Sequence, residues 1–177
     1  SAPSPACRGG LGWGFSMKRR NGDPDKPRPT AYDKALGHLA RREQSRRELR
    51  RKLDQSGYAG DEADAALIRL ADQHYQDDER FAGMLLRNRA GQGYGPLRIR
   101  MELKTHGLSD TAIRQLLDEA EVDWNASAAT QLRRHYGGKP ATDRAEQGKR
   151  AQFLLRRGFA AATVRYATHA EVDEADE

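Results

Sequence analysis

Residues 45–58, SRRELRRKLDQSGY, form a short basic amphipathic pattern that stops at a glycine. Ser45 and Glu48 match the S-x-x-E capping box, which marks the first turn of a helix. Two leucines four residues apart predict the buried side of that helix. Gly57 is the residue type that most easily takes the left-handed conformation at a helix end. The stretch therefore predicts one short basic helix that ends at Gly57.

The same ending recurs twice further along the chain. A leucine is followed four residues later by glycine and then by an apolar residue, at steps of 50 and 51 residues, in Leu53–Tyr58, Leu103–Leu108 and Leu154–Phe159. A helical pattern precedes and another follows each of these segments, which predicts three helices per unit. We therefore expect an all-α fold in which three tandem three-helix repeats form an elongated, curved array.

The chain divides into five predicted segments. They are a flexible N-terminal arm at 1–30, repeats at 31–76, 77–123 and 124–170, and an acidic C-terminal tail at 171–177. Proline and glycine crowd the arm, which shows no apolar period. In the third repeat Val164 keeps the first apolar position after the glycine, but Thr168 takes the second. We therefore expect the last helix to be shorter or less tightly packed.

Charge, cysteine content and hydropathy indicate the cellular compartment that we expect for the protein. The chain has 31 Lys and Arg against 26 Asp and Glu, a net charge of +5, and a single cysteine, Cys7, which cannot form an internal disulfide. No apolar run approaches the roughly 18 residues of a membrane-spanning helix. We expect a cytoplasmic monomer that does not contact a membrane.

Basic residues return on the second helix of every repeat. This repetition predicts a basic ribbon along the array, which suits a partner with acidic side chains or phosphates. The alternative for any single helix is a solvated face with ion pairs four residues apart. The candidate binding residues are Arg46, Arg47, Arg50, Arg51, Tyr94, Arg98, Arg100, Lys149, Arg150, Arg156 and Arg157.

Enzymatic chemistry finds no support in the sequence. The glycine-rich segments at 91–96 and 137–140 lack the dinucleotide and phosphate-loop motifs, and the histidines lack metal-ligand spacing. No nucleophile, base and orienting residue stand out together. We expect no catalytic residue, no cofactor and no metal site, and hence a protein that is not an enzyme.

Several stretches resemble the RecX family, the regulatory proteins of the recombinase RecA. Residues 75–82, YQDDERFA, with 93–103, GYGPLRIRMEL, closely resemble the central signature of that family. Residues 45–58 resemble its first repeat, and 153–159, FLLRRGF, its last. The resemblance covers roughly residues 31–170, in order and at the right spacing. It departs mildly at Ala63, where the family usually carries a larger aliphatic residue.

The resemblance implies a negative modulator of RecA. Such a protein would bind in the groove of the RecA–DNA filament, bridge neighbouring subunits, and restrain filament growth, ATP hydrolysis, strand exchange and coprotease activity. Single- or double-stranded DNA would be a weak accessory contact. The alternative is a helical-repeat DNA-binding protein that acts directly on nucleic acid, for which binding to naked DNA would depend steeply on salt.

Overall fold

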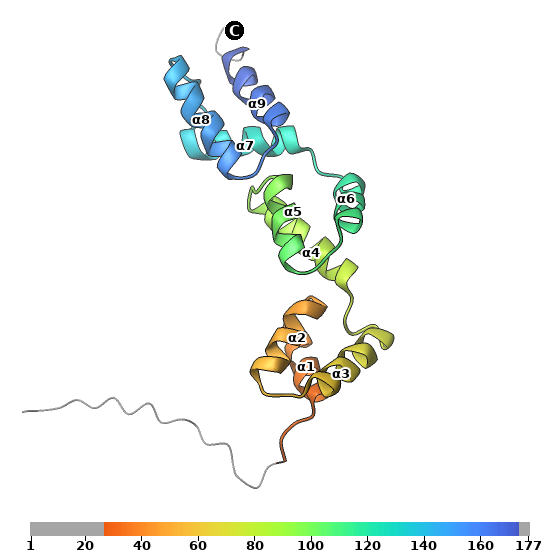
Figure 1. The fold of residues 1–177 in the computed structure, drawn as a ribbon. Coiled ribbons are helices and arrows are strands. Elements are labelled where there is room, and N and C mark those ends of the chain that lie inside the picture. Colours follow the sequence, from red (N-terminus) through yellow and green to blue (C-terminus); the bar gives the residue numbers. More distant parts are fainter. Residues whose placement is uncertain (1–26, 174–177) are drawn as a thin grey trace, which may run out of the picture.

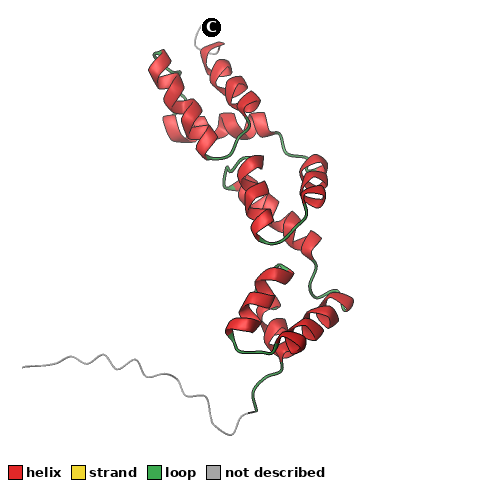
Figure 2. Ribbon diagram, in the orientation of Figure 1, coloured by secondary structure: helices red, strands yellow, loops and turns green. Residues whose placement is uncertain are grey.

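The computed structural model describes residues 27–173, and over this range it contains nine helices and no strand (Figure 1). Figure 2 shows that short loops alone connect them. The helices are α1 (Ala31–Leu39), α2 (Arg46–Gln55), α3 (Gly60–Asp72), α4 (Asp78–Gly91), α5 (Pro96–Thr105), α6 (Asp110–Glu119), α7 (Trp124–Tyr136), α8 (Arg144–Arg156) and α9 (Ala161–Asp173). The all-α fold of three tandem three-helix repeats is confirmed.

Side-chain caps fix where many of the helices begin. The Ser45 hydroxyl accepts a hydrogen bond from the Glu48 N–H at 3.2 Å, as the capping-box pattern predicts. Aspartates do the same for α4, α7 and α8, where Asp77, Asp123 and Asp143 accept from backbone N–H groups of the first turn. In α5, Pro96 occupies the first helical position, where no backbone N–H is needed.

Each repeat closes around a small apolar core of its own. In the first repeat Leu49 and Leu53 of α2 pack with Leu67 and Leu70 of α3, all of them buried. The second core includes Phe81, Ile99, Leu103 and Ile113, and the third includes Leu132, Leu154, Phe159 and Val164. Trp124, at the start of α7, packs against both of these later cores. The repeats are therefore separate packing units that meet at narrow junctions.

The repeats follow one another along the long axis of the molecule (Figure 1). The second helices, α2, α5 and α8, lie along one side of this arrangement, and the third helices lie along the other. Backbone contacts establish the junction between α5 and α8. The N–H groups of Gly95 and Leu97 donate to the carbonyl oxygens of Arg157 and Gly158, at 2.8 and 3.0 Å. Two backbone donors at the N-terminal end of α5 are thus satisfied by the C-terminal end of α8.

Side chains make most of the corresponding junction between the start of α2 and the second repeat, at the end of α5 and the start of α4. The Ser45 hydroxyl lies 2.9 Å from Nδ1 of His106, the residue that caps the end of α5. The backbone N–H of Arg46 donates to Asp78 at 2.8 Å, and Arg80 forms an ion pair with Glu43 at 2.6 Å. In both junctions, the start of one second helix therefore meets the end of the next.

Two expected boundaries are corrected. The arm at 1–30 is docked at its end, because the Tyr58 hydroxyl donates to the Pro29 carbonyl at 2.7 Å and the Arg28 guanidinium lies over the Tyr58 ring. Residues 1–26 lie outside the described part. The last helix is not short: α9 has 13 residues and reaches Asp173, so the first three residues of the predicted acidic tail are helical. Residues 174–177 are also outside the described part.

Candidate functional site

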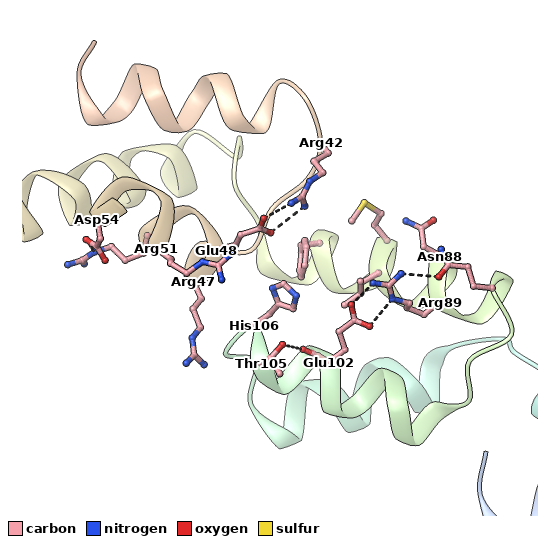
Figure 3. A pocket seen from close by; sticks show the side chains of 15 residues that line it. Arg42, Arg47, Glu48, Arg51, Asp54, Asn88, Arg89, Glu102, Thr105 and His106 are labelled. Carbon is pink, nitrogen blue, oxygen red and sulfur yellow. Dashed lines mark hydrogen bonds and ion pairs between the residues drawn. The ribbon is translucent and has the colours of Figure 1, made fainter. Parts of the chain in front are cut away.

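The side of the molecule formed by α2, α5 and α8 carries the candidate site. An open groove of about 970 Å³ runs between α2 of the first repeat and α4 and α5 of the second. Arginines dominate its lining: Arg42, Arg47, Arg50, Arg51 and Arg89. Figure 3 shows Arg42, Arg47 and Arg51 on the side of the first repeat and Arg89 on the side of the second. The structure thus brings together three predicted site residues of α2 with two arginines that were not predicted.

Two carboxylates neutralise part of this groove. Glu102 accepts two hydrogen bonds from the guanidinium of Arg89, at 2.6 and 2.7 Å, in a fork geometry visible in Figure 3. These hydrogen bonds hold the pKa of Glu102 below its ordinary value, although burial opposes them. Burial also tends to raise the pKa of Glu48, but hydrogen bonds from Lys52 and Arg42 leave it lowered. Arg42 and Arg89 are therefore held by internal acids.

Two predicted site residues are engaged in ion pairs in the same way. Arg50 pairs with Asp54 at 3.0 Å and also with Asp64. Arg100 pairs with Asp110 at 2.8 Å. For these two arginines, the alternative of a solvated face with ion pairs is what the structure contains.

Six predicted cations remain exposed without such a partner. Within residues 27–169, whose side chains the structure describes, no carboxylate lies within ion-pair distance of Arg46, Arg47, Arg51, Arg98, Lys149 or Arg156. Arg47 and Arg51 are one helical turn apart on α2, and Lys149 and Arg156 are two turns apart on α8. Arg98 extends over the ring of Tyr94, with its guanidinium 4.5 Å from the ring centre. These residues form what we call the cation row.

Arg150 does not belong to that row, which corrects the sequence prediction. Its side chain is only 1% exposed and donates to the Lys139 carbonyl and to Glu146, both at 2.7 Å. Its guanidinium also lies over the ring of Tyr136, 4.6 Å from the centre. Arg150 therefore holds the loop before α8 against α7 and α8, and it cannot reach an external partner.

Tyr94 and Arg157 also differ from expectation, because both help to join the second and third repeats. The Arg157 guanidinium donates to the carbonyls of Gln92 and Gly93 at 3.1 and 3.3 Å. It also lies over the rings of Tyr94 and Phe153. Tyr94 is half-buried and packs against the second core instead of standing alone in its turn. The contacts of both side chains are therefore largely internal.

A second groove, of about 760 Å³, lies between α5 and α8. It brings together the predicted residues Tyr94, Arg98 and Arg156 with three exposed apolar side chains, Leu97, Met101 and Leu155. These three apolar residues were not predicted from the sequence as part of a site. Leu97 and Met101 are four residues apart, opposite the buried pair Ile99 and Leu103, so the periodicity of α5 contained a signal for the first two.

Comparison with known proteins identifies the family. Models of three successive RecX domains match this chain, the first at residues 31–70, the second at 77–117 and the third at 121–168. The regulatory protein RecX of Xanthomonas axonopodis pv. citri (strain 306) is 48% identical over 145 residues, which cover 82% of this chain and 90% of that protein. The chain belongs to the RecX family.

Other RecX proteins agree with this assignment. The regulatory protein RecX of Stenotrophomonas maltophilia (strain R551-3) is 44% identical over 145 residues, covering 82% of this chain and 89% of the relative. The crystal structure of RecX from Lactobacillus salivarius superposes with a TM-score of 0.66 at 22% identity, covering 82% of this chain and 94% of the other. At that identity the likeness concerns the fold. The resemblance inferred from residues 31–170 is thus confirmed.

Two further findings concern membrane-spanning helices and metal sites. Among the described helices, none is long and apolar enough to cross a membrane. The same part of the chain has no cluster of three or more His, Cys, Asp or Glu side chains that could hold a metal ion. The RecX relatives are named regulatory proteins.

Proposed function

We propose that this RecX-family chain is a negative modulator of RecA that binds in the groove of the RecA–DNA filament through the face formed by α2, α5 and α8. Binding there would restrain filament growth, ATP hydrolysis, strand exchange and coprotease activity. The cation row is the observation that supports this proposal. Its members occur on the second helix of every repeat, and these helices lie on one side of the molecule (Figure 1).

The row suits a filament because no carboxylate of the described side chains pairs with its cations. The charges of Arg50 and Arg100 are neutralised by neighbouring carboxylates, so these residues attract an acidic partner only weakly. Arg47, Arg51 and Arg156 are exposed without such a carboxylate and attract it more strongly. Guanidinium groups bind carboxylates and phosphates through two parallel hydrogen bonds. A face distributed over three repeats can contact successive subunits of a polymer and so oppose changes in their spacing.

ATP hydrolysis by RecA on single-stranded DNA tests the proposal directly. The purified protein should suppress hydrolysis at a ratio well below one molecule per RecA subunit, because one chain would restrain several subunits. Hydrolysis that stays unchanged across a wide titration contradicts the proposal.

A pair of charge-reversed variants tests the face. Arg51→Glu with Lys149→Glu reverses two members of the cation row on α2 and α8, and we expect filament binding to weaken by about tenfold or more. Arg114→Glu with Arg165→Glu makes the same change in net charge on exposed positions of α6 and α9. We expect this control to bind within about twofold of the parent. Equal weakening by both pairs would mean that net charge alone, and not the face, drives binding.

Direct action on nucleic acid is the second candidate, since the cation row would also attract DNA phosphates. Titration of naked single- and double-stranded DNA between about 50 and 200 mM salt separates the two functions. An accessory role predicts weak binding to naked DNA and tighter binding to the filament. Equal affinity for both would favour a DNA-binding protein over a RecA modulator.

A further inference from the structure

The groove between α5 and α8 differs chemically from the rest of the basic face. Six large apolar side chains are exposed among residues 27–169, whose side chains the structure describes, and three of them line this one groove. Leu97 is 51% exposed, Met101 70% and Leu155 43%. Contiguous exposed apolar side chains on a folded protein mark contact sites, whereas single ones are common.

The groove is also preformed. Its two walls are joined by the hydrogen bonds from Gly95 and Leu97 of α5 to the carbonyls at the end of α8. Arg157 adds bonds to the loop before α5, at the carbonyls of Gln92 and Gly93. A site whose walls are fixed in this way loses little conformational entropy when a partner binds.

Unneutralised positive charge borders the apolar floor. Arg89 and Glu102 line the groove but neutralise each other at 2.6 Å. Arg98 and Arg156 are then the remaining charged side chains of the lining, and both are exposed. A partner segment that fits must therefore combine an apolar side chain with carboxylates around it.

From this combination we propose that the α5–α8 groove docks an acidic protein segment that inserts an apolar side chain between Leu97, Met101 and Leu155. The inference rests on the proposed function and assigns this part of the face to contact with protein instead of nucleic acid. Arg98 and Arg156 would pair with the carboxylates of the segment. Methionine and arginine are both enriched in protein–protein interfaces.

Nucleic acid fits this groove less well. Single strands bind to proteins by stacking their bases on aromatic rings. The aromatic residue of the lining is Tyr94, and the guanidiniums of Arg98 and Arg157 already lie over its ring, 4.5 and 5.6 Å from the centre. The floor itself is aliphatic, and the groove between α2 and α5 has the greater number of arginines.

The chain's own N-terminal segment is a poor occupant as well. Residues 1–26 contain five Lys and Arg against two Asp, so they carry the same sign of charge as the rim. The acidic residues at 174–177 have the matching charge, and the experiment below includes them as a competing occupant.

The test compares two double variants in which exposed apolar side chains become glutamine. Met101→Gln with Leu155→Gln removes the apolar floor, and Ile68→Gln with Tyr166→Gln is the control at exposed positions on α3 and α9. Binding is measured by anisotropy of the labelled protein with RecA filaments on single-stranded DNA and with the same DNA alone. We expect the first variant to bind filaments about tenfold more weakly, with unchanged binding to DNA alone and an unchanged circular dichroism spectrum. The control should match the parent in all three measurements.

Each contrary result has its own meaning. If the parent binds filaments and Met101→Gln with Leu155→Gln binds them equally well, the groove inference is wrong while the proposed function stands. An equal loss of affinity for DNA alone would assign the groove to nucleic acid. Tighter filament binding after removal of residues 174–177 would assign it to the chain's own acidic residues. A parent that does not bind filaments overturns the proposed function and the inference together.

Discussion

The Cα of Gly158 faces the start of α5 so closely that a Cβ built on it would lie 2.5 Å from the Cβ of Arg98. The two residues are 60 positions apart in the chain and belong to different repeats. This approach allows the carbonyl of Gly158 to accept the N–H of Leu97. Gly158 also has φ +85°, so the same residue ends α8 and joins the second repeat to the third.

Replacing Gly158 with alanine is expected to open this junction. The left-handed conformation alone costs alanine roughly 1–2 kcal/mol, and the clash with Arg98 adds to that cost. We expect a loss of at least about 2 kcal/mol in the free energy of unfolding, measured by urea denaturation. Gly148→Ala is the matched control, because this glycine lies within α8 and a Cβ there meets nothing within 4 Å. It should stabilise by about 0.5–1 kcal/mol, and equal effects would contradict the junction geometry.

Arg150 is expected to matter for stability and not for filament binding. Arg150→Met would remove the guanidinium donor from the Lys139 carbonyl and from one oxygen of Glu146, which would keep only its bonds from Thr142, at a cost of about 2 kcal/mol. Lys149→Met, at the exposed neighbouring position, should change stability by less than about 0.5 kcal/mol but weaken filament binding. Thermal unfolding and filament affinity, measured on both variants, distinguish the two roles. Weak binding by a fully stable Arg150→Met protein would contradict the burial of this side chain.

Local patterns explain why the repeats were predictable. The leucine–glycine spacing of residues 45–58 depends on contacts within one or two helical turns, and each repeat buries its own core from such contacts. Gly158 illustrates the limit of that reasoning. Its helix-ending role follows from its neighbours, whereas its contact with Arg98 depends on how two repeats meet.

The same distinction applies to the candidate site. The sequence shows basic residues on the second helix of each repeat. Whether each of them is paired, buried or exposed depends on residues that are distant in the sequence. Arg50 is paired with Asp64, 14 residues away, and Arg150 is buried beneath a ring from the preceding helix. Arg51 meets neither kind of partner within the described residues and remains exposed. To tell paired, buried and exposed cations apart, one must know how α7 packs on α8 and how α2 packs on α3.

Glu146 should make stability depend on acid pH. Hydrogen bonds from the Thr142 backbone N–H, the Arg150 guanidinium and the Thr142 hydroxyl lower the pKa of Glu146 to about 2. Since the folded pKa lies below the unfolded value, the stabilisation is complete above about pH 4.5 and is lost as the pH falls toward 2. The difference in Tm between the parent and Glu146→Gln should therefore be large at pH 6 and shrink at pH 3. Glu121→Gln, on an exposed connector, should show no comparable change between these pH values.

His106 should make the junction between the first two repeats sensitive to milder acid. Its ring packs on Phe81 with centroids 4.7 Å apart, and its Nδ1 lies 2.9 Å from the Ser45 hydroxyl. Burial lowers the pKa of His106 below 6.5, against an opposing effect from Glu48 and Glu102. The folded protein therefore favours the neutral ring. The Ser45 oxygen already accepts from the Glu48 N–H, so its own hydrogen can be donated to a neutral Nδ1.

Lowering the pH is therefore expected to weaken this junction. A histidine whose pKa is lower in the folded state makes its full contribution to the free energy of unfolding above about pH 6.5. That contribution falls as the pH drops from there through the folded pKa. The urea midpoint of the parent should decline between pH 7.5 and pH 5, and His106→Gln should show a smaller decline over the same range. His169→Gln, at an exposed position on α9, should decline as the parent does. If the urea midpoint of His106→Gln declines as steeply as that of the parent, the imidazole at this junction is not the source of the pH dependence and another group is.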